Sequence, residues 1–263
     1  MVFRPKKSLG QNFLIDKNII NLIIEQGNIT SKDVVLEIGP GTGNLTNYIL
    51  DKNPKKLIVV EKDSNLSNEL KNKFHDKVKV INEDILKINE REISDEKMIV
   101  FGNLPYNISS QILVKWIKLD FLNFFSKKFI LMFQKEVADR IIAQFNEKNY
   151  GRLSILSSWR MEIKKIKDIS PKSFYPVPKV ESTILLMKPK KNYFILNNPK
   201  NLEYITNVFF NQKRKMVKKP LNLLFKNSDI IKKKLNISPS LRPQNLSPED
   251  YLKICKEYEN LLQ

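Results

Sequence analysis

The chain has 263 residues, and 41% of them are hydrophobic, which suffices for one good core and a small appended domain. The longest apolar stretches, such as Phe129 to Phe133, fall far short of the about 20 residues of a membrane span. Residues 1–7 lack the apolar run of a secretory signal, so we expect a cytoplasmic protein. A single cysteine and a single histidine exclude an intramolecular disulfide and a typical zinc site, and we expect no metal.

The charge is strongly positive and uneven along the chain. There are 46 basic against 28 acidic residues, a net charge of +18. A positive surface attracts polyanions such as nucleic acid, although lysine and asparagine are abundant throughout, so part of the excess reflects general composition. Residues 186–263 hold 16 basic and 6 acidic side chains, so the C-terminal third is the more basic part.

Short β-branched runs alternate with amphipathic stretches between Lys32 and Phe133, the pattern of a sheet with crossover helices. The predicted strands are Val34 to Ile38, Leu57 to Glu61, Val78 to Ile81, Met98 to Phe101 and Phe129 to Phe133. The predicted helices are Asn44 to Leu50, Leu66 to Phe74, Ser109 to Lys118 and Lys135 to Phe145. We therefore predict a doubly wound, Rossmann-like α/β domain.

The residue pattern changes toward the C-terminus. Strand-like segments at Glu162 to Lys167 and Ser182 to Met187 bracket a proline-rich loop and are expected to extend the sheet. After them come predicted helices at Leu202 to Lys215, Ser228 to Leu235 and Pro248 to Leu262. We predict two domains, an α/β domain over residues 1–188 and a small all-helical domain over residues 189–263.

A glycine-rich segment, Glu37-Ile38-Gly39-Pro40-Gly41-Thr42-Gly43, follows the first predicted strand and opens the first helix. Ligands bind at this carboxyl edge of such sheets, and glycine lets a ligand approach the backbone closely. The spacing differs from the dinucleotide fingerprint, which disfavours a nicotinamide enzyme.

Acidic residues stand at the ends of the next two strands. Glu61 is placed to accept the two hydroxyls of a ribose. Asp84 is placed to accept a hydrogen bond from an adenine amino group, with Ile85 beside the ring. Each is a weak signal alone, but together they describe a nucleoside pocket. Because the sequence has no pyrophosphate loop and no Walker lysine, S-adenosylmethionine fits better than NAD or ATP.

The segment Gly102-Asn103-Leu104-Pro105-Tyr106 ends the fourth strand, again at the functional edge. The side-chain oxygen of Asn103 and the carbonyl of Leu104 form a candidate acceptor pair for the two protons of an exocyclic amine, which would aim its lone pair at a methyl donor. Pro105 fixes the turn, and Tyr106 is a candidate stacking surface for an extruded base.

At this point the chain resembles the ribosomal RNA adenine dimethyltransferases, and within them the KsgA-type small-subunit enzymes. The resemblance lies in Lys7 to Leu14, Glu37 to Gly43, Gly102 to Ser109, Gln134 to Glu136, Tyr150 to Ser154 and Phe174 to Ser182. It covers nearly the whole chain. It implies a methyltransferase sheet and dimethylation of two adjacent adenines in a hairpin near the 3′ end of small-subunit rRNA, within a ribosomal assembly particle.

The resemblance also implies site residues. It adds Phe174 as a second stacking face opposite Tyr106. It assigns donor contacts to Gln11, Asn12, Leu14, Gly39, Glu61, Asp84 and Asn103. Gly41 of the glycine-rich segment and Ile85 beside Asp84 complete the predicted donor site.

The C-terminal domain resembles the family's RNA-facing appendage, in Phe210 to Lys215 and Arg242 to Ser247. Lys213, Arg214, Lys215 and Arg242 are the candidate RNA contacts. One departure stands out, because Lys213 replaces the first of two arginines usual in the family and would contact phosphate as a point charge. Because a basic surface suits docking on a ribosomal particle, we expect the protein to be a monomer.

Three other functions remain open from the sequence. A large-subunit rRNA adenine methyltransferase of the antibiotic-resistance type would share the cofactor site and residues 103–106, but the tract 174–182 argues against it. A non-catalytic ribosome assembly factor would not need Asn103, Glu61 and Asp84. A DNA adenine methyltransferase is a weaker option, since it more often carries an acidic residue at the position of Asn103.

Overall fold

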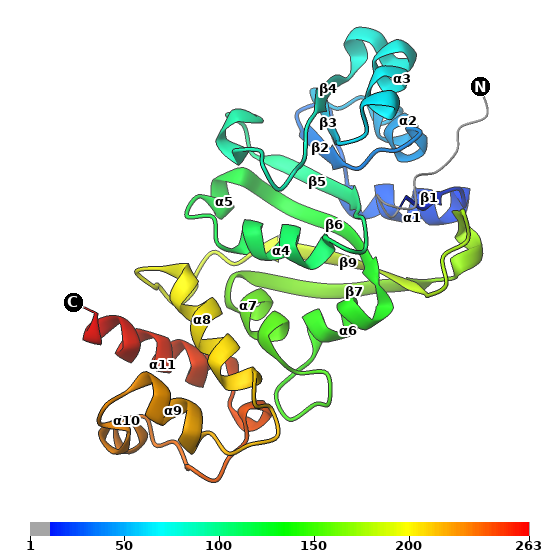
Figure 1. Ribbon diagram of the computed structural model, residues 1–263. Helices are drawn as coiled ribbons and strands as arrows, with labels where there is room; N and C mark the ends of the chain where they lie inside the picture. The colour runs from blue at the N-terminus through cyan, green and yellow to red at the C-terminus, as the bar shows by residue number, and fades with distance from the viewer. Residues whose placement is uncertain (1–10, 263) are drawn as a thin grey trace. The chain divides into compact units, whose positions relative to one another are not determined.

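The computed structural model describes residues 11–262, which form two compact units (Figure 1). The first unit comprises the described residues up to Ala138 together with Glu162–Pro189. The second comprises Asp139–Met161 and the described residues from Lys190 onward. This division differs from the predicted boundary between residues 188 and 189, because residues 139–161 belong with the C-terminal helices. Their helix α7 (Arg152–Arg160) packs against helices of the second unit.

Within the described residues, the first unit is built on a seven-stranded sheet with the order β4-β3-β2-β5-β6-β9-β7. The strands from β4 to β6 are parallel, and β9 runs antiparallel to β6. Strand β2 is buried along its whole length, as a central parallel strand must be. The bounds are β2 Val34–Ile38, β3 Lys56–Glu61, β4 Lys79–Asn82, β5 Met98–Asn103, β6 Ser126–Gln134, β7 Met161–Ile169 and β9 Ser182–Pro189.

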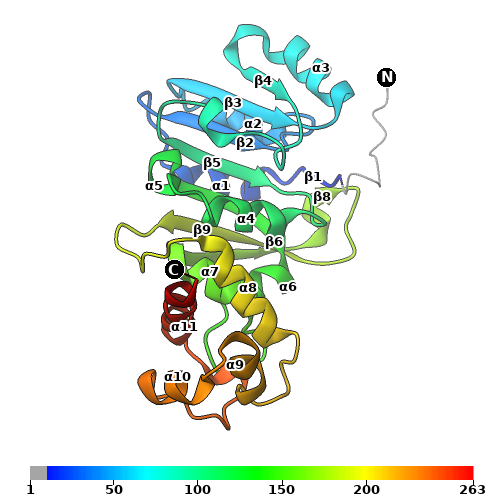
Figure 2. The ribbon, with the colours of Figure 1, turned by 60° about the vertical axis from the view of Figure 1, so that its left-hand side comes forward.

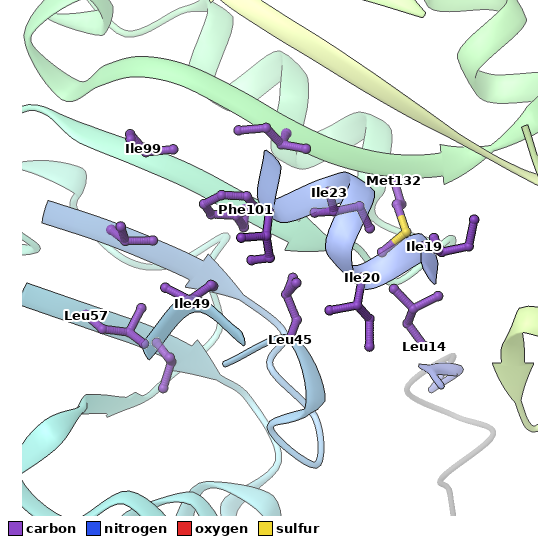
Figure 3. Packing of buried hydrophobic residues seen from close by; sticks show 14 of the residues in the cluster. Leu14, Ile19, Ile20, Ile23, Leu45, Ile49, Leu57, Ile99, Phe101 and Met132 are labelled. Atoms are coloured by element: carbon purple, nitrogen blue, oxygen red, sulfur yellow. The ribbon is translucent and has the colours of Figure 1, made fainter. Parts of the chain in front are cut away.

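Helices cover both faces of this sheet. On one face, α1 (Lys17–Gly27), α2 (Asn44–Leu50) and α3 (Ser64–Phe74) bury a hydrophobic cluster around Phe101 of β5. Figure 3 shows the residues that α1 and α2 contribute to it. On the other face, Trp116 of α4 (Ser109–Ile117) stacks on Phe129 of β6 with ring centroids 5.3 Å apart. Neighbouring residues of each strand point to opposite faces, so the apolar runs supply both cores. The predicted doubly wound α/β fold is confirmed.

A separate two-stranded sheet joins β1 (Phe13–Leu14) to β8 (Phe174–Tyr175), side by side in Figure 2. Its partners are Phe13 with Tyr175 and Leu14 with Phe174. The N-terminus of α1 is attached at the same place, because Asp16 caps α1 and accepts a hydrogen bond from the Ser173 hydroxyl at 3.0 Å. The first described segment is thereby tied to the tract that precedes β9.

The second unit is helical. Helices α7, α8 (Pro199–Phe210) and α11 (Pro248–Leu261) pack together, with α9 (Lys218–Leu224) beside α10 (Ser228–Lys234). Aromatic rings form much of its core, including Phe209 against Tyr251 at 5.2 Å. The predicted helix over Leu202 to Lys215 is wrong at its end. Helix α8 stops at Phe210, and a turn follows in which the Lys215 amide donates to the Gln212 carbonyl.

Short elements complete the first unit: α5 (Leu122–Phe125) and 3-10 turns at His75–Lys77, Glu90–Glu92 and Pro171–Ser173. Helix α6 (Lys135–Ile142) follows β6, and the second unit adds a 3-10 turn at Pro243–Asn245. Among residues 11–262, no helix is both long enough and apolar enough to span a bilayer.

Candidate active site

A pocket opens in the first unit where the carboxyl ends of the parallel strands meet. It brings together most of the side chains that the sequence predicted for donor binding and chemistry. The predicted residues that line it are Gln11, Asn12, Gly39, Gly41, Glu61, Asp84, Ile85, Asn103, Leu104, Pro105 and Tyr106. It is also lined by residues that sequence reasoning missed: Phe13, Ile38, Val60, Lys62, Leu66, Glu83, Asn107 and Ile108.

The glycine-rich turn after β2 forms one wall. Gly39 has a φ of +66° and Gly41 a φ of +58°, values that L side chains rarely adopt. A Cβ at Gly41 would meet the ring of Phe13 at 2.5 Å, so glycine lets the β1 segment lie directly on the turn. The turn thus exposes backbone, rather than side chains, toward the pocket.

Glu61, the last residue of β3, is held by main-chain donors. Its Oε2 accepts from the Gly41 amide at 3.2 Å and its Oε1 from the Asp63 amide at 2.8 Å. The side chain is buried, and this burial raises its pKa despite those hydrogen bonds. A carboxylate held in place at the pocket wall is suited to accept hydrogen bonds from two neighbouring hydroxyls.

Asp84 follows β4 and already carries two partners. Its Oδ1 accepts from the Leu86 amide at 3.0 Å, and its Oδ2 lies 2.9 Å from Nζ of Lys62. Burial alone would raise the pKa of Asp84, but the hydrogen bonds from Lys62 and Leu86 outweigh it and hold the pKa below the usual value of an aspartate. Asp84 is therefore an ionised acceptor at neutral pH.

Asn103 is the last residue of β5, and its amide is oriented by the backbone of the first described segment. Its Nδ2 donates to the Asn12 carbonyl at 2.7 Å. Because the two ends of a carboxamide point apart, this bond fixes where Oδ1 is presented. The side chain of the next residue, Leu104, is 1% exposed, and Pro105 begins the turn into α4.

Tyr106 is anchored through its hydroxyl. The hydroxyl lies 2.6 Å from Oγ of Ser182, the first residue of β9. Burial raises the pKa of Tyr106 in spite of this bond, so the phenol stays neutral at physiological pH. The ring is only partly buried and lies at the pocket wall, where a planar group can reach it.

Two predicted residues do not line the pocket. Leu14 and Phe174 pair across the β1–β8 sheet and belong to the hydrophobic core, with exposed fractions of 4% and 1%. A stacking surface needs an exposed face, so the structure does not place Phe174 opposite Tyr106 as a second stacking ring. Residues along a strand alternate between faces, and Phe174 occupies the inward position.

The candidate RNA contacts lie in the second unit. Arg214, Lys215 and Arg242 are exposed. Lys213 differs, because its Nζ donates to the carbonyls of Lys148 at 2.7 Å and Tyr150 at 3.2 Å. The position where this chain departs from the family pattern is therefore bound to its own backbone. No group of three or more potential metal ligands occurs within the part of the chain that the structure describes.

Comparison with known proteins identifies the class of fold. The fold belongs to the Rossmann-like methyltransferases. The chain shares it with a dimethyladenosine transferase from Plasmodium falciparum, at a TM-score of 0.81 and 29% identity over 94% of this chain and 98% of that one. The same fold occurs in ErmE, a 23S rRNA methyltransferase, at a TM-score of 0.69 and 22% identity over 94% of this chain and 99% of that one.

The family model for ribosomal RNA adenine dimethylase matches residues 2–260, and the chain belongs to this family. A curated relative, ribosomal RNA small subunit methyltransferase A of Pelagibacter ubique (strain HTCC1062), is 59% identical over 99% of each chain.

Proposed function

We propose that this protein transfers methyl groups from S-adenosylmethionine to the 6-amino groups of two adjacent adenines in a hairpin near the 3′ end of small-subunit rRNA, giving dimethyladenosine. The observation that carries the proposal is the family match over residues 2–260, joined to the small-subunit relative at 59% identity. The oriented amide of Asn103 in the pocket at the strand ends supports it.

The pocket residues fit the methyl donor. Glu61 offers a buried carboxylate to the ribose hydroxyls, and the backbone around Gly39 offers an approach that a side chain would fill. Asp84 offers an acceptor to the adenine amino group, with Ile85 against the ring. Bound S-adenosylmethionine supplies an electrophilic methyl group. Gln11 and Asn12 close the pocket from the side of the first described segment.

Asn103 and Leu104 perform the positioning. With Nδ2 committed to Asn12, Oδ1 of Asn103 accepts a hydrogen bond from one N–H of the target amine, and in the first transfer the Leu104 carbonyl accepts a hydrogen bond from the other. This pair draws the nitrogen out of conjugation with the purine and aims its lone pair. Tyr106 stacks on the extruded base. After methylation the excess proton leaves the nitrogen for solvent, so the site needs no strong base.

The exposed cations of the second unit, Arg214, Lys215 and Arg242, contact the rRNA backbone. A net charge of +18 assists recruitment to rRNA. We infer that the protein acts as a monomer on an assembling small subunit in the cytoplasm, with a role in its biogenesis. Lys213 stabilises the turn that presents Arg214 rather than contacting phosphate itself.

The test is to incubate the protein with radiolabelled S-adenosylmethionine and, separately, unmethylated small and large ribosomal subunits, followed by nucleoside analysis. We expect dimethyladenosine in small subunits alone. Label confined to large subunits would instead favour the antibiotic-resistance type of enzyme. RNA binding without label would favour an assembly factor.

A further inference from the structure

The small β1–β8 sheet carries an exposed aromatic residue, Tyr175. Tyr175 of β8 is 59% exposed, although its backbone is paired in the β1–β8 sheet. Its cross-strand partner is Phe13, which lines the pocket and rests on Gly41. Directly opposed residues of antiparallel strands project from the same face, with Cβ atoms about 4.5 to 5.5 Å apart. Tyr175 therefore stands on the pocket-facing side, next to the pocket wall.

The two faces of this small sheet have different environments. Leu14 and Phe174 are buried in the core beneath it. Phe13 and Tyr175 occupy the other face, where Phe13 is covered and Tyr175 is open. A large aromatic ring held in place by main-chain pairing loses little further entropy when a flat ligand stacks on it.

The neighbouring chain suits an anionic strand with exposed bases. Val177 and Val180 are also exposed, at 61% and 42%. Lys172 and Lys179 are exposed in the same tract. The nearest carboxylate in this tract, Glu181, is neutralised by Lys135 at 2.6 Å. Aromatic stacking with adjacent cations is the usual combination for binding single-stranded nucleic acid.

We propose that Tyr175 is a nucleobase-binding residue that stacks on the nucleotide next to the target adenine. The proposal rests on the rRNA-methylating function above and extends it to a second base site. Extruding one nucleotide leaves its neighbour unstacked, and a surface that accepts this neighbour offsets the loss of stacking. In a substrate with two adjacent adenines, the site holds one while the other is methylated.

The experiment compares the wild-type protein with Tyr175→Ala, Tyr175→Phe and the control Phe124→Ala. Phe124 is an 80% exposed aromatic residue of α5, which leads into the amino end of β6, opposite to the pocket edge. The probe is a short RNA hairpin with two adjacent adenines in its loop, one replaced by 2-aminopurine. Its fluorescence falls when the base stacks.

We expect Tyr175→Ala to weaken hairpin binding by about 5- to 150-fold, the range for one base stack, and to abolish the added quenching. Tyr175→Phe and Phe124→Ala should behave like the wild type, and S-adenosylmethionine affinity and melting temperature should be unchanged in all. Wild-type binding and quenching by Tyr175→Ala would overturn the proposal. So would a loss in Tyr175→Phe equal to that in Tyr175→Ala, since it would assign the effect to the hydroxyl. A wild-type protein that binds the hairpin but leaves small subunits unmethylated would refute the proposed function instead.

Discussion

The hydroxyl of Tyr106 lies 2.6 Å from the hydroxyl of Ser182, and this bond joins the loop after β5 to the first residue of β9. The two residues are 76 positions apart in the chain. The bond links the segment 102–109 to the segment 174–182, both of which the sequence singles out, and it places the Tyr106 ring at the pocket wall.

If this hydrogen bond holds the Tyr106 ring in place, removing either hydroxyl should have the same effect on activity. Tyr106→Phe and Ser182→Ala should each lower the turnover number for rRNA methylation by about 2- to 10-fold, as expected for one hydrogen bond. The double variant should be no slower than either single variant. Steady-state methylation of small subunits by the four proteins measures this. A double variant whose loss of turnover equals the product of the two single losses would mean that the contact does not position Tyr106.

Lys115 of α4 fixes the loop that carries Asp84 and Ile85. Its Nζ donates to the carbonyls of Ile85 and Ile88 and lies 2.8 Å from Oε1 of the buried Glu90. Lys115→Met leaves the Glu90 charge unpaired, which should lower the free energy of unfolding by about 3 kcal/mol, near the usual loss for a broken buried pair.

The same substitution should weaken S-adenosylmethionine binding, because Ile85 lines the pocket. Adding Glu90→Gln should restore most of the stability, since the amide removes the buried charge and still accepts from Trp116 Nε1. Urea unfolding and calorimetric donor binding measure both effects. An unchanged donor affinity in Lys115→Met would show that the position of this loop does not affect donor binding.

Glu37 should make the folded state less stable as pH rises. Complete burial raises its pKa from 4.5 to about 8, even though the Thr46 hydroxyl donates to it at 2.7 Å. Between about pH 4.5 and pH 8 the folded state keeps a proton that the unfolded chain has released, so raising the pH favours unfolding. The effect is roughly 1.4 kcal/mol for each unit by which the two pKa values differ.

Glu37→Gln removes this titration while keeping an acceptor for Thr46. Its melting temperature should therefore rise relative to that of the wild type as the pH goes from 5 to 8, and the two should converge near pH 4. Thermal unfolding of both proteins over this range is the measurement. Melting curves that keep a constant separation would show that Glu37 is ionised when folded.

Arg214 and Lys213, at the turn after α8, should have different roles, one in RNA binding and the other in stability. Arg214→Glu should weaken rRNA binding, reduce its salt dependence and leave donor binding intact, because Arg214 is exposed. Lys213→Ala should instead lower the melting temperature, because its ammonium holds the carbonyls of Lys148 and Tyr150. Salt titrations of RNA binding distinguish them. A salt slope for Arg214→Glu equal to that of the wild type would make the tract a solvated surface only.

Sequence periodicity predicted the sheet well, since the β-branched runs bury both faces of each strand. The predicted Val34 to Ile38 and Asn44 to Leu50 agree with β2 and α2 at both ends. The first described helix, α1, was missed, as were α7 and α9. The two-residue strands β1 and β8 were also missed, because they are defined by pairing over a long separation rather than by local pattern.

For the site, the strand ends predicted the pocket correctly, because parallel strands bring their carboxyl ends to one edge. The sequence does not reveal side-chain direction in the tract 174–182. Phe174 and Tyr175 are adjacent aromatic residues, and only the pairing with Leu14 and Phe13 shows which one points into the core. The hydrogen bonds of Lys213 could not be predicted from the sequence either, because their acceptor carbonyls lie more than 60 residues away.

Single-turnover methylation of unmethylated small subunits by the wild type and Asn103→Ala, at saturating S-adenosylmethionine, tests directly whether Asn103 orients the target amine. The substitution removes the acceptor presented by Oδ1 and leaves Glu61, Asp84 and the second unit in place. We predict near-normal RNA binding with loss of most dimethyladenosine formation, at a donor concentration high enough to saturate the variant as well as the wild type. Single-turnover methylation at the wild-type rate would contradict the assignment of Asn103 as the residue that orients the target amine.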